Sequence, residues 1–204
     1  METIRSGPRP LTIVLIVLAA VVGLLGAIGG IGYLYVATAE QRPLTERDRR
    51  LLITAEDLAP YFYDFEPSDD FARFEKERYF DGSSWVDYTY DSPLEDEPWI
   101  SCSISYERKL SDALTIYATE LSGQRISLQF ADDAIDTQNR NDFFSAGDQS
   151  TFADITYDGA VTGHCFVIRQ GRSVLSFMLS GFVMDDPAIW RELLSQRLKQ
   201  LDQR

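Results

Sequence analysis

The sequence predicts an α+β protein, in which an N-terminal transmembrane helix precedes one domain of antiparallel sheet with packed helices. Three observations predict this class. Residues 11–36 carry no charged side chain, residues 151–180 hold strand-like runs joined by tight-turn dipeptides, and residues 187–201 repeat apolar side chains at helical spacing. We therefore divide the chain into a polar tail (1–10), a transmembrane helix (11–36), a stalk or linker (37–53) and a soluble α+β domain (54–204).

The uncharged segment is long enough to cross a bilayer, because about 20 helical residues span the hydrocarbon core. Tyr33 and Tyr35 stand at its far end, where aromatic side chains favour the headgroup layer. A buried core helix of this length does not fit so small a domain. A signal peptide cleaved after Ala39 is the remaining alternative, but the apolar region of a signal peptide typically has only about 7–15 residues.

The orientation of the segment depends on two opposing signals. Arg5 and Arg9 precede it and four arginines follow it closely, so the count of positive charges alone favours a cytoplasmic body. A short basic head, an apolar run and a small-x-small end are together typical of exported proteins. We predict a single-pass cell-membrane protein that contacts lipid through residues 11–36 and has an extracytoplasmic body.

Small residues form a stripe along the predicted transmembrane helix. The glycines of this stripe are Gly23, Gly26, Gly29, Gly30 and Gly32. A smooth stripe lets a second helix approach closely, so we expect a membrane-protein partner or a homodimer. The alternative is that glycine is simply frequent in membrane helices.

Alternating apolar and polar residues predict the strands in the first half of the domain. After a short helix over 54–61, with Thr54 as its N-cap, we expect strands over 71–80, 85–90 and 99–106. The last of these places Ile100, Cys102, Ile104 and Tyr106 on one face and serines on the other, which is typical of a half-buried strand.

The second half is predicted to hold a helix, a strand, a meander and a terminal helix. The helix covers 111–121 and ends at Gly123, and a strand over 125–130 follows. Asp158-Gly159 and Gln170-Gly171 then mark two tight turns of a three-stranded meander. The last element begins at Asp186-Pro187, a typical helix start, and carries an amphipathic stripe to Leu201.

The order of these elements over residues 80–200 is similar to that of the PsbP-like extrinsic domains of photosystem II. The resemblance lies in element order and includes no motif residue. It therefore implies a fold and no function.

Composition excludes several classes of function. A net charge of −13 repels phosphates, so nucleic acid is not an expected partner. His164 and Cys165 are neighbours in a predicted strand and point to opposite faces, so they form no catalytic dyad. Because the chain also holds no known catalytic motif, we expect no enzyme activity, no cofactor and no metal.

The two cysteines, Cys102 and Cys165, both fall in predicted strands. A disulfide requires Cα atoms within about 7 Å of each other, which sequence does not show. We expect either one disulfide in an oxidising compartment or two separate buried thiols.

Acidic and aromatic residues concentrate between positions 54 and 97. The candidate partner surface consists of Asp69, Asp70, Glu95, Asp96 and Glu97. Acidic groups steer a basic partner, and aromatic side chains anchor interfaces. Calcium binding and a solvated acidic face are the alternatives.

Together these features predict a membrane-anchored binding or accessory-subunit domain. One alternative is a small-molecule or lipid-binding domain, with a pocket between the terminal helix and the meander near Phe177 and Trp190. The other alternative is an enzyme that uses two carboxylates with raised pKa values.

Overall fold

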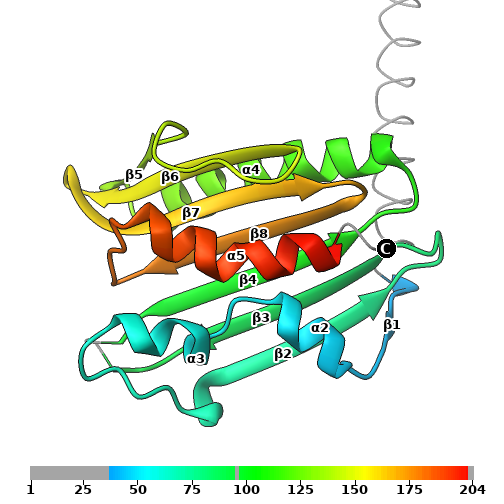
Figure 1. The fold of residues 1–204 in the computed structure, drawn as a ribbon, viewed down its shortest axis with the longest axis horizontal. Coiled ribbons are helices and arrows are strands. Elements are labelled where there is room, and N and C mark those ends of the chain that lie inside the picture. The colour runs from blue at the N-terminus through cyan, green and yellow to red at the C-terminus, as the bar shows by residue number, and fades with distance from the viewer. Residues whose placement is uncertain (1–36, 95–96, 202–204) are drawn as a thin grey trace, which may run out of the picture. The chain divides into compact units, whose positions relative to one another are not determined.

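A computed structural model describes residues 37–94 and 97–201, which form an α+β fold around one eight-stranded antiparallel sheet (Figure 1). The strand order is β1-β2-β3-β4-β8-β7-β6-β5. The strands are β1 Glu40–Gln41, β2 Ala72–Arg78, β3 Ser84–Asp91, β4 Trp99–Tyr106, β5 Ile135–Asn139, β6 Gln149–Tyr157, β7 Ala160–Gln170 and β8 Ser173–Ser180. The helices are α2 Glu46–Leu51, α3 Ala55–Leu58, α4 Leu110–Ala131 and α5 Pro187–Leu201, with 3-10 turns η1 Ala59–Tyr61 and η2 Asp69–Phe71.

The predicted strands of the first half and the predicted meander of the second half are confirmed. Val86, Tyr88 and Tyr90 of β3 are fully buried, as alternation with polar neighbours requires of one strand face. The meander over 151–180 is present as β6, β7 and β8. Asp158 and Gly159 have φ values of 49° and 80°, the left-handed backbone that a tight hairpin turn needs.

Helices α2, α3 and α5 cover one face of the sheet, which we call the near face (Figure 1). Trp190 of α5 is fully buried there, and its ring lies 5.5 Å from the ring centroids of both Phe166 and Phe177. Large apolar side chains from β3, β4, β7 and β8 complete this core. Because burial of each such side chain contributes about 1.5–3 kcal/mol, this layer supplies most of the fold's hydrophobic stabilisation.

Helix α4 covers the opposite face of the sheet, which we call the far face. Ala113 and Tyr117 pack on Val167 and Val174, and Leu128 packs on a second small cluster. Helix α4 contacts β4, β8, β7 and β5, and the Tyr117 hydroxyl hydrogen-bonds Thr151 of β6. The serine side of β4 therefore becomes more buried than we predicted, with Ser103 and Ser105 at 6% and 3% exposure.

The predicted end of the central helix at Gly123 is wrong. Helix α4 continues through Gly123 to Ala131, so residues 125–130 are helical and do not form a strand. A glycine inside a helix costs only about 1 kcal/mol, and the contacts of Gln124 and Leu128 with the sheet outweigh that cost. The strand that follows is β5, a mostly polar segment in which Ile135 is the single apolar residue.

The predicted stalk also requires correction. Glu40 begins a compact unit, and the run Leu51–Ile53 is fully buried in the near-face core. Asp48 of α2 is buried and accepts from Lys76 at 2.6 Å. Burial opposes the ionisation of Asp48, but bonds from Lys76 and Thr45 outweigh it and lower its pKa to about 2. The folded domain thus starts earlier than residue 54.

The predicted transmembrane helix (11–36) and its glycine stripe lie outside the described residues. Within residues 37–94 and 97–201, no helix has both the length and the apolar character that crossing a bilayer requires.

Candidate functional site

One end of the sheet gathers acidic residues on loop segments that contain no lysine or arginine. The antiparallel order brings together the segments 59–71, 91–94, 97–98, 132–136, 157–159 and 181–188 at this end. We call it the acidic end. Its twelve carboxylates are Asp64, Glu66, Asp69, Asp70, Asp91, Glu97, Asp132, Asp133, Asp136, Asp158, Asp185 and Asp186, and these segments contain no lysine or arginine.

Tyr90 joins two of the acidic segments. Its hydroxyl accepts from the Ser68 N–H at 3.4 Å and donates to Glu97 at 2.7 Å. Burial, together with the Glu97 carboxylate, raises the pKa of Tyr90 to about 12, so the hydroxyl keeps its proton. The structure therefore places Glu97 at the same end as Asp69 and Asp70, whereas Glu95 and Asp96 lie outside the described residues.

Exposed apolar side chains accompany these acids. Tyr63 is 94% exposed, and Asp64 beside it has a φ of 58°, a conformation that few residues other than glycine adopt. Leu94 and Val183 are also exposed. Beneath them, Phe62 and Phe65 pack on Phe182, which fixes the loops that carry the acids.

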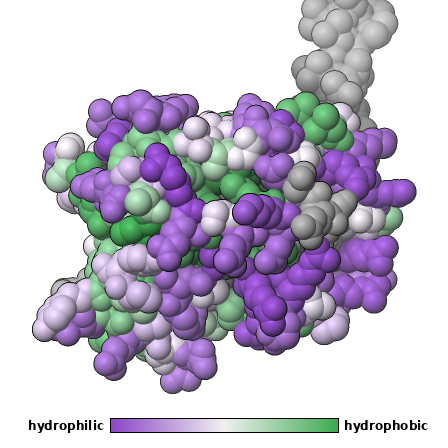
Figure 2. Space-filling model, viewed as in Figure 1, coloured by the Kyte–Doolittle hydropathy of each residue, from purple (hydrophilic) through white to green (hydrophobic). Residues whose placement is uncertain are grey.

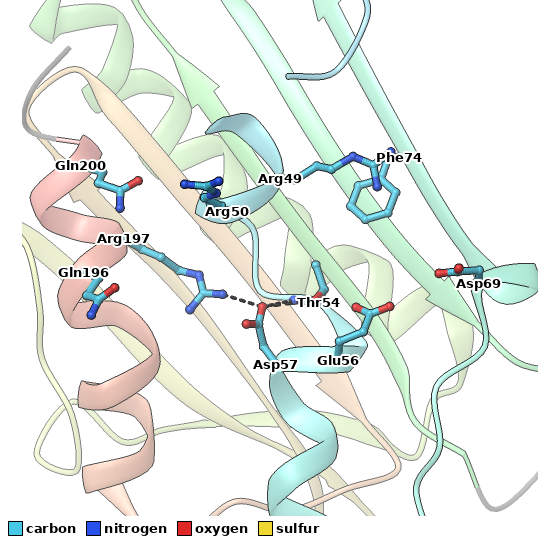
Figure 3. Close-up of a pocket in the computed structure, with 10 residues that line it drawn as sticks. All are labelled: Arg49, Arg50, Thr54, Glu56, Asp57, Asp69, Phe74, Gln196, Arg197 and Gln200. Carbon is cyan, nitrogen blue, oxygen red and sulfur yellow. Dashed lines mark hydrogen bonds and ion pairs between the residues drawn. The ribbon is translucent and has the colours of Figure 1, made fainter. Parts of the chain in front are cut away.

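A second candidate is an open cleft of about 520 Å³ on the near face (Figure 3). Hydrophilic residues gather over this part of the molecule (Figure 2). The residues that line the cleft come from α2, α3, α5 and the region of β2. They are Arg49, Arg50, Thr54, Glu56, Asp57, Asp69, Phe74, Gln196, Arg197 and Gln200.

Most of the cleft's charge is already engaged. Arg197 donates to the carbonyls of Leu52 and Leu193 and pairs with Asp57 at 2.5 Å. Arg49 stacks over the Phe74 ring at 4.5 Å. Arg50 forms no ion pair within the described part of the chain. The cleft therefore offers the exposed guanidiniums of Arg49 and Arg50 for an anionic group, and within it the Thr54 hydroxyl donates to Asp57 at 3.2 Å.

His164 is buried in a network that sequence reasoning missed. Its Nε2 accepts from the Met184 N–H at 2.8 Å, so Nδ1 carries the proton and donates to Asp154 at 2.9 Å. Asp154 also pairs with Arg140 at 2.6 Å. The ring is fully buried, and burial lowers the pKa of His164 despite the nearby Asp154. This network positions the loop before α5. Its histidine ring is buried, so a substrate in solution does not reach it.

The hairpin register explains why the pair was missed. A two-residue turn at Asp158-Gly159 would place Ala153 opposite His164 if pairing were regular. A bulge near Ile155 shifts the register by one, and Asp154 then lies opposite His164. The sequence signal for this bulge is weak.

The predicted disulfide alternative is wrong, because both cysteines are free and buried. Cys102 faces the near-face core, whereas Cys165 belongs to a cluster under α4. The strand β8 also separates their strands. Burial raises the pKa of each thiol to about 12, so the two behave as small apolar side chains.

The predicted ligand pocket between α5 and the meander is filled. Phe177 and Trp190 are fully buried and pack in edge contact there. Within the described residues no group of three or more His, Cys, Asp or Glu side chains forms a metal-binding cluster.

Comparison with known proteins finds no matching family model, no matching curated protein and no matching solved structure. The likeness to PsbP-like domains in element order therefore stays a prediction.

Proposed function

We propose that this protein is a single-pass membrane-anchored binding or accessory subunit whose extracytoplasmic domain docks a basic partner on its acidic end. The observation that carries the proposal is the concentration of twelve carboxylates at one end of the sheet, on segments that contain no lysine or arginine. A surface that only keeps the domain in solution does not need its acidic residues separated from its basic residues.

The physics of association supports this reading. Clustered charge of one sign steers a partner of opposite sign and raises the association rate by about 10–10³-fold at low salt. Exposed Tyr63 and Leu94 then offer apolar area at the same surface. The acidic end thus combines a long-range attraction with a short-range anchor.

The first residues of the folded unit lie away from the acidic end. Glu40, where the compact unit begins, pairs with Arg78 at the opposite end of the sheet from the acidic end. A tether preceding residue 40 therefore joins the domain far from the proposed docking surface.

A matched pair of variants tests the docking surface in the full chain. One carries Asp69→Asn, Asp70→Asn, Asp185→Asn and Asp186→Asn. The control carries Glu40→Gln, Glu46→Gln, Glu75→Gln and Asp142→Asn, four exposed acids outside the acidic end. We expect purification in mild detergent to recover a basic membrane partner, with recovery reduced about tenfold in the first variant and unchanged in the control. Recovery of a free monomer, or equal recovery from both variants, contradicts the proposal.

A cysteine label tests the topology. Tyr63→Cys places a thiol at a 94% exposed position, while the two native thiols are buried and give little background. We expect a membrane-impermeant maleimide to label this variant in intact cells. Labelling only after lysis would place the body in the cytoplasm, and release of the chain by alkaline carbonate would exclude the anchor.

A small-molecule binding function is the second candidate. The observation favouring it is the cleft beside Arg50, whose guanidinium suits a carboxylate or phosphate group. An Arg50→Gln variant that keeps partner recovery but loses anion binding would separate the two functions.

A further inference from the structure

The end of the sheet opposite the acidic end carries basic side chains on loops that the strand order brings together (Figure 1). We call it the tether end, and it consists of the segments 40–43, 78–84, 106–110 and 171–173. Its basic residues are Arg42, Arg78, Arg108, Lys109 and Arg172, and its acidic residues are Glu40, Asp81 and Glu107. The remaining loop on this side, 140–148, lies at the β5–β6 edge of the sheet, where Arg140 and Asp148 are engaged in ion pairs. The acidic end and the tether end therefore differ in the sign of their charge.

Three basic side chains of the tether end are exposed and have no carboxylate partner. Arg78, Arg108 and Lys109 form no ion pair within residues 37–94 and 97–201. Glu40 is paired with Arg42, and the other two acids of this end accept from serine hydroxyl groups. Two guanidinium groups and one ammonium group are thus available to an external anion.

Two open clefts, of about 430 Å³ and about 340 Å³, lie at the tether end and share Gly82 in their lining. The basic residues that line them are Arg42, Lys76 and Arg78 in the first cleft and Arg108 and Arg172 in the second. Among the described residues Glu107 is the one acid of either lining, and Lys76 is already bonded to Asp48. Arginine presents a planar fork of N–H donors, which suits the oxygens of a phosphate group.

Hydrogen bonds join the two clefts into one surface. Arg108 donates to the Asp81 carbonyl at 3.1 Å, and Arg172 donates to the Arg108 carbonyl at 3.0 Å. Gly82 has a φ of 86°, and a Cβ at this position would lie only 3.1 Å from the Arg108 side chain. The turn after β2 and the loop after β4 are therefore fixed against each other.

The chain enters the domain at this end. Glu40 begins β1 and pairs with Arg78. The segment that we predict to cross the membrane ends at residue 36, and four residue steps reach at most about 14 Å. A chain anchored as proposed above therefore keeps the tether end close to the lipid headgroups. Two exposed apolar side chains, Phe80 at 67% and Leu110 at 50%, lie on the loops of this end.

We propose that the tether end binds the surface of an anionic bilayer, with its clefts holding lipid phosphates and with Phe80 and Leu110 entering the headgroup layer. This inference rests on the membrane anchor proposed above and holds for either orientation of the body, provided that the facing leaflet is anionic. Each Lys or Arg near such a leaflet strengthens association about fivefold. The same lipids repel the acidic end, so both ends orient the domain in the same sense. The acidic end then points away from the membrane.

Quenching by a labelled lipid tests this contact in the full chain. The variant Leu110→Cys carries a fluorophore at the tether end, and Tyr63→Cys carries the same fluorophore at the acidic end, while both native thiols are buried. The vesicles contain phosphatidylcholine, about one-third phosphatidylglycerol and a lipid with a nitroxide on its headgroup. We expect strong quenching at residue 110, little at residue 63, and a clear loss of quenching at residue 110 in phosphatidylcholine alone. Because β2 and β3 separate β4 from β1, the tether by itself does not hold residue 110 at the lipid.

A matched pair of triple variants locates the surface. One carries Arg78→Gln, Arg108→Gln and Lys109→Gln. The control carries Arg73→Gln, Arg125→Gln and Arg191→Gln, three exposed basic residues outside the tether end that form no ion pair in the described part of the chain. We expect the first variant to shift the equilibrium away from the lipid-bound position by about 100-fold, so that quenching at residue 110 falls to the level at residue 63. The control should keep the quenching, and Phe80→Ser should reduce it by a smaller factor.

Extraction of the same vesicles with alkaline carbonate separates this inference from the anchor. Release of the chain would overturn the anchor and the lipid contact together. If the chain is retained, equal quenching at residues 110 and 63 would overturn the lipid contact alone. So would quenching that is unchanged in phosphatidylcholine alone, or that both triple variants lower equally. Circular dichroism of each variant confirms that a lost signal does not reflect unfolding.

Discussion

His164 illustrates, at the scale of a single residue, how the surrounding donors fix a charge state. Nε2 of His164 accepts a hydrogen bond from the Met184 N–H. A second ring proton would have to bind at Nε2, where it would point at this donor and break the bond. Met184 in turn accepts from the Trp190 indole at 3.1 Å, and the histidine thereby anchors the start of α5. The groups that face the ring are Asp154 from β6, Arg140 from the segment after β5 and Asp185 from the loop before α5.

The lowered pKa of His164 gives a signed prediction for stability. The unfolded histidine titrates near pH 6.5, whereas the folded ring resists protonation, so the unfolded state binds more protons below about pH 6.5. The contribution of His164 to stability is therefore complete above about pH 6.5 and falls as the pH is lowered through that value. Urea unfolding at about pH 8 and about pH 5 measures the loss.

The variant His164→Gln isolates this contribution from the titration of carboxylates. Its amide keeps a donor and an acceptor but does not titrate, so the variant should lose less stability than the wild type between these pH values. It should also be less stable overall by about 1–3 kcal/mol at neutral pH. Parallel pH profiles for the two proteins would show that His164 is not the responsible group.

Helix α4 shows, at the scale of an element, where local patterns mislead. Ile126, Leu128 and Phe130 alternate like a strand, but in the helix Leu128 is buried and Phe130 is 88% exposed. Gln124, which we gave no role, makes three hydrogen bonds to the sheet. Contact with the sheet, which no local window contains, decides the conformation of this segment.

The elements with strong local signals were predictable. The meander follows from its turn dipeptides, and α5 follows from its cap, its proline and its apolar stripe. The acidic end was only partly predictable, because it is the sheet topology that places Asp69 and Asp70 at the same end of the sheet as Asp132 and Asp185. The bulge that pairs Asp154 with His164 likewise depends on strand register rather than on composition.

Two glycines give a matched test of these packing arguments. A Cβ at Gly123 would meet no atom within 4 Å, so Gly123→Ala should stabilise the protein by about 0.5–1 kcal/mol through helix propensity. A Cβ at Gly163 would lie 2.0 Å from the Leu179 carbonyl oxygen, so Gly163→Ala should destabilise it markedly. Thermal unfolding of both variants checks the signs. A lower melting temperature for Gly123→Ala would contradict an uninterrupted α4.

At the scale of the whole molecule, the separation of charge has an energetic cost. Twelve carboxylates at one end of the sheet repel one another, and mobile ions screen this repulsion beyond about 10 Å at 0.1 M salt. The same charges that we propose to steer a partner therefore destabilise the isolated domain.

Salt dependence of stability measures that cost. At about 0.02 M salt, the variant with Asp69, Asp70, Asp185 and Asp186 changed to asparagine should melt at a higher temperature than the wild type. We expect its free energy of unfolding to be larger by about 1 kcal/mol. The gain should shrink in about 0.5 M salt and should be smaller in the control variant with four amides outside the acidic end. An equal gain in both variants would show that total charge matters and that its clustering does not.

The central pairing of β4 with β8 has a consequence for biosynthesis. Trp99–Tyr106 lies beside Ser173–Ser180, so the middle of the sheet joins stretches separated by the whole of α4 and three other strands. A nascent chain emerging from the ribosome can build β2–β4 early, but the edge of β4 stays open until nearly all of the polypeptide has been made. During that interval an exposed, apolar edge strand is available to neighbouring chains, and a holding chaperone would find its binding site there.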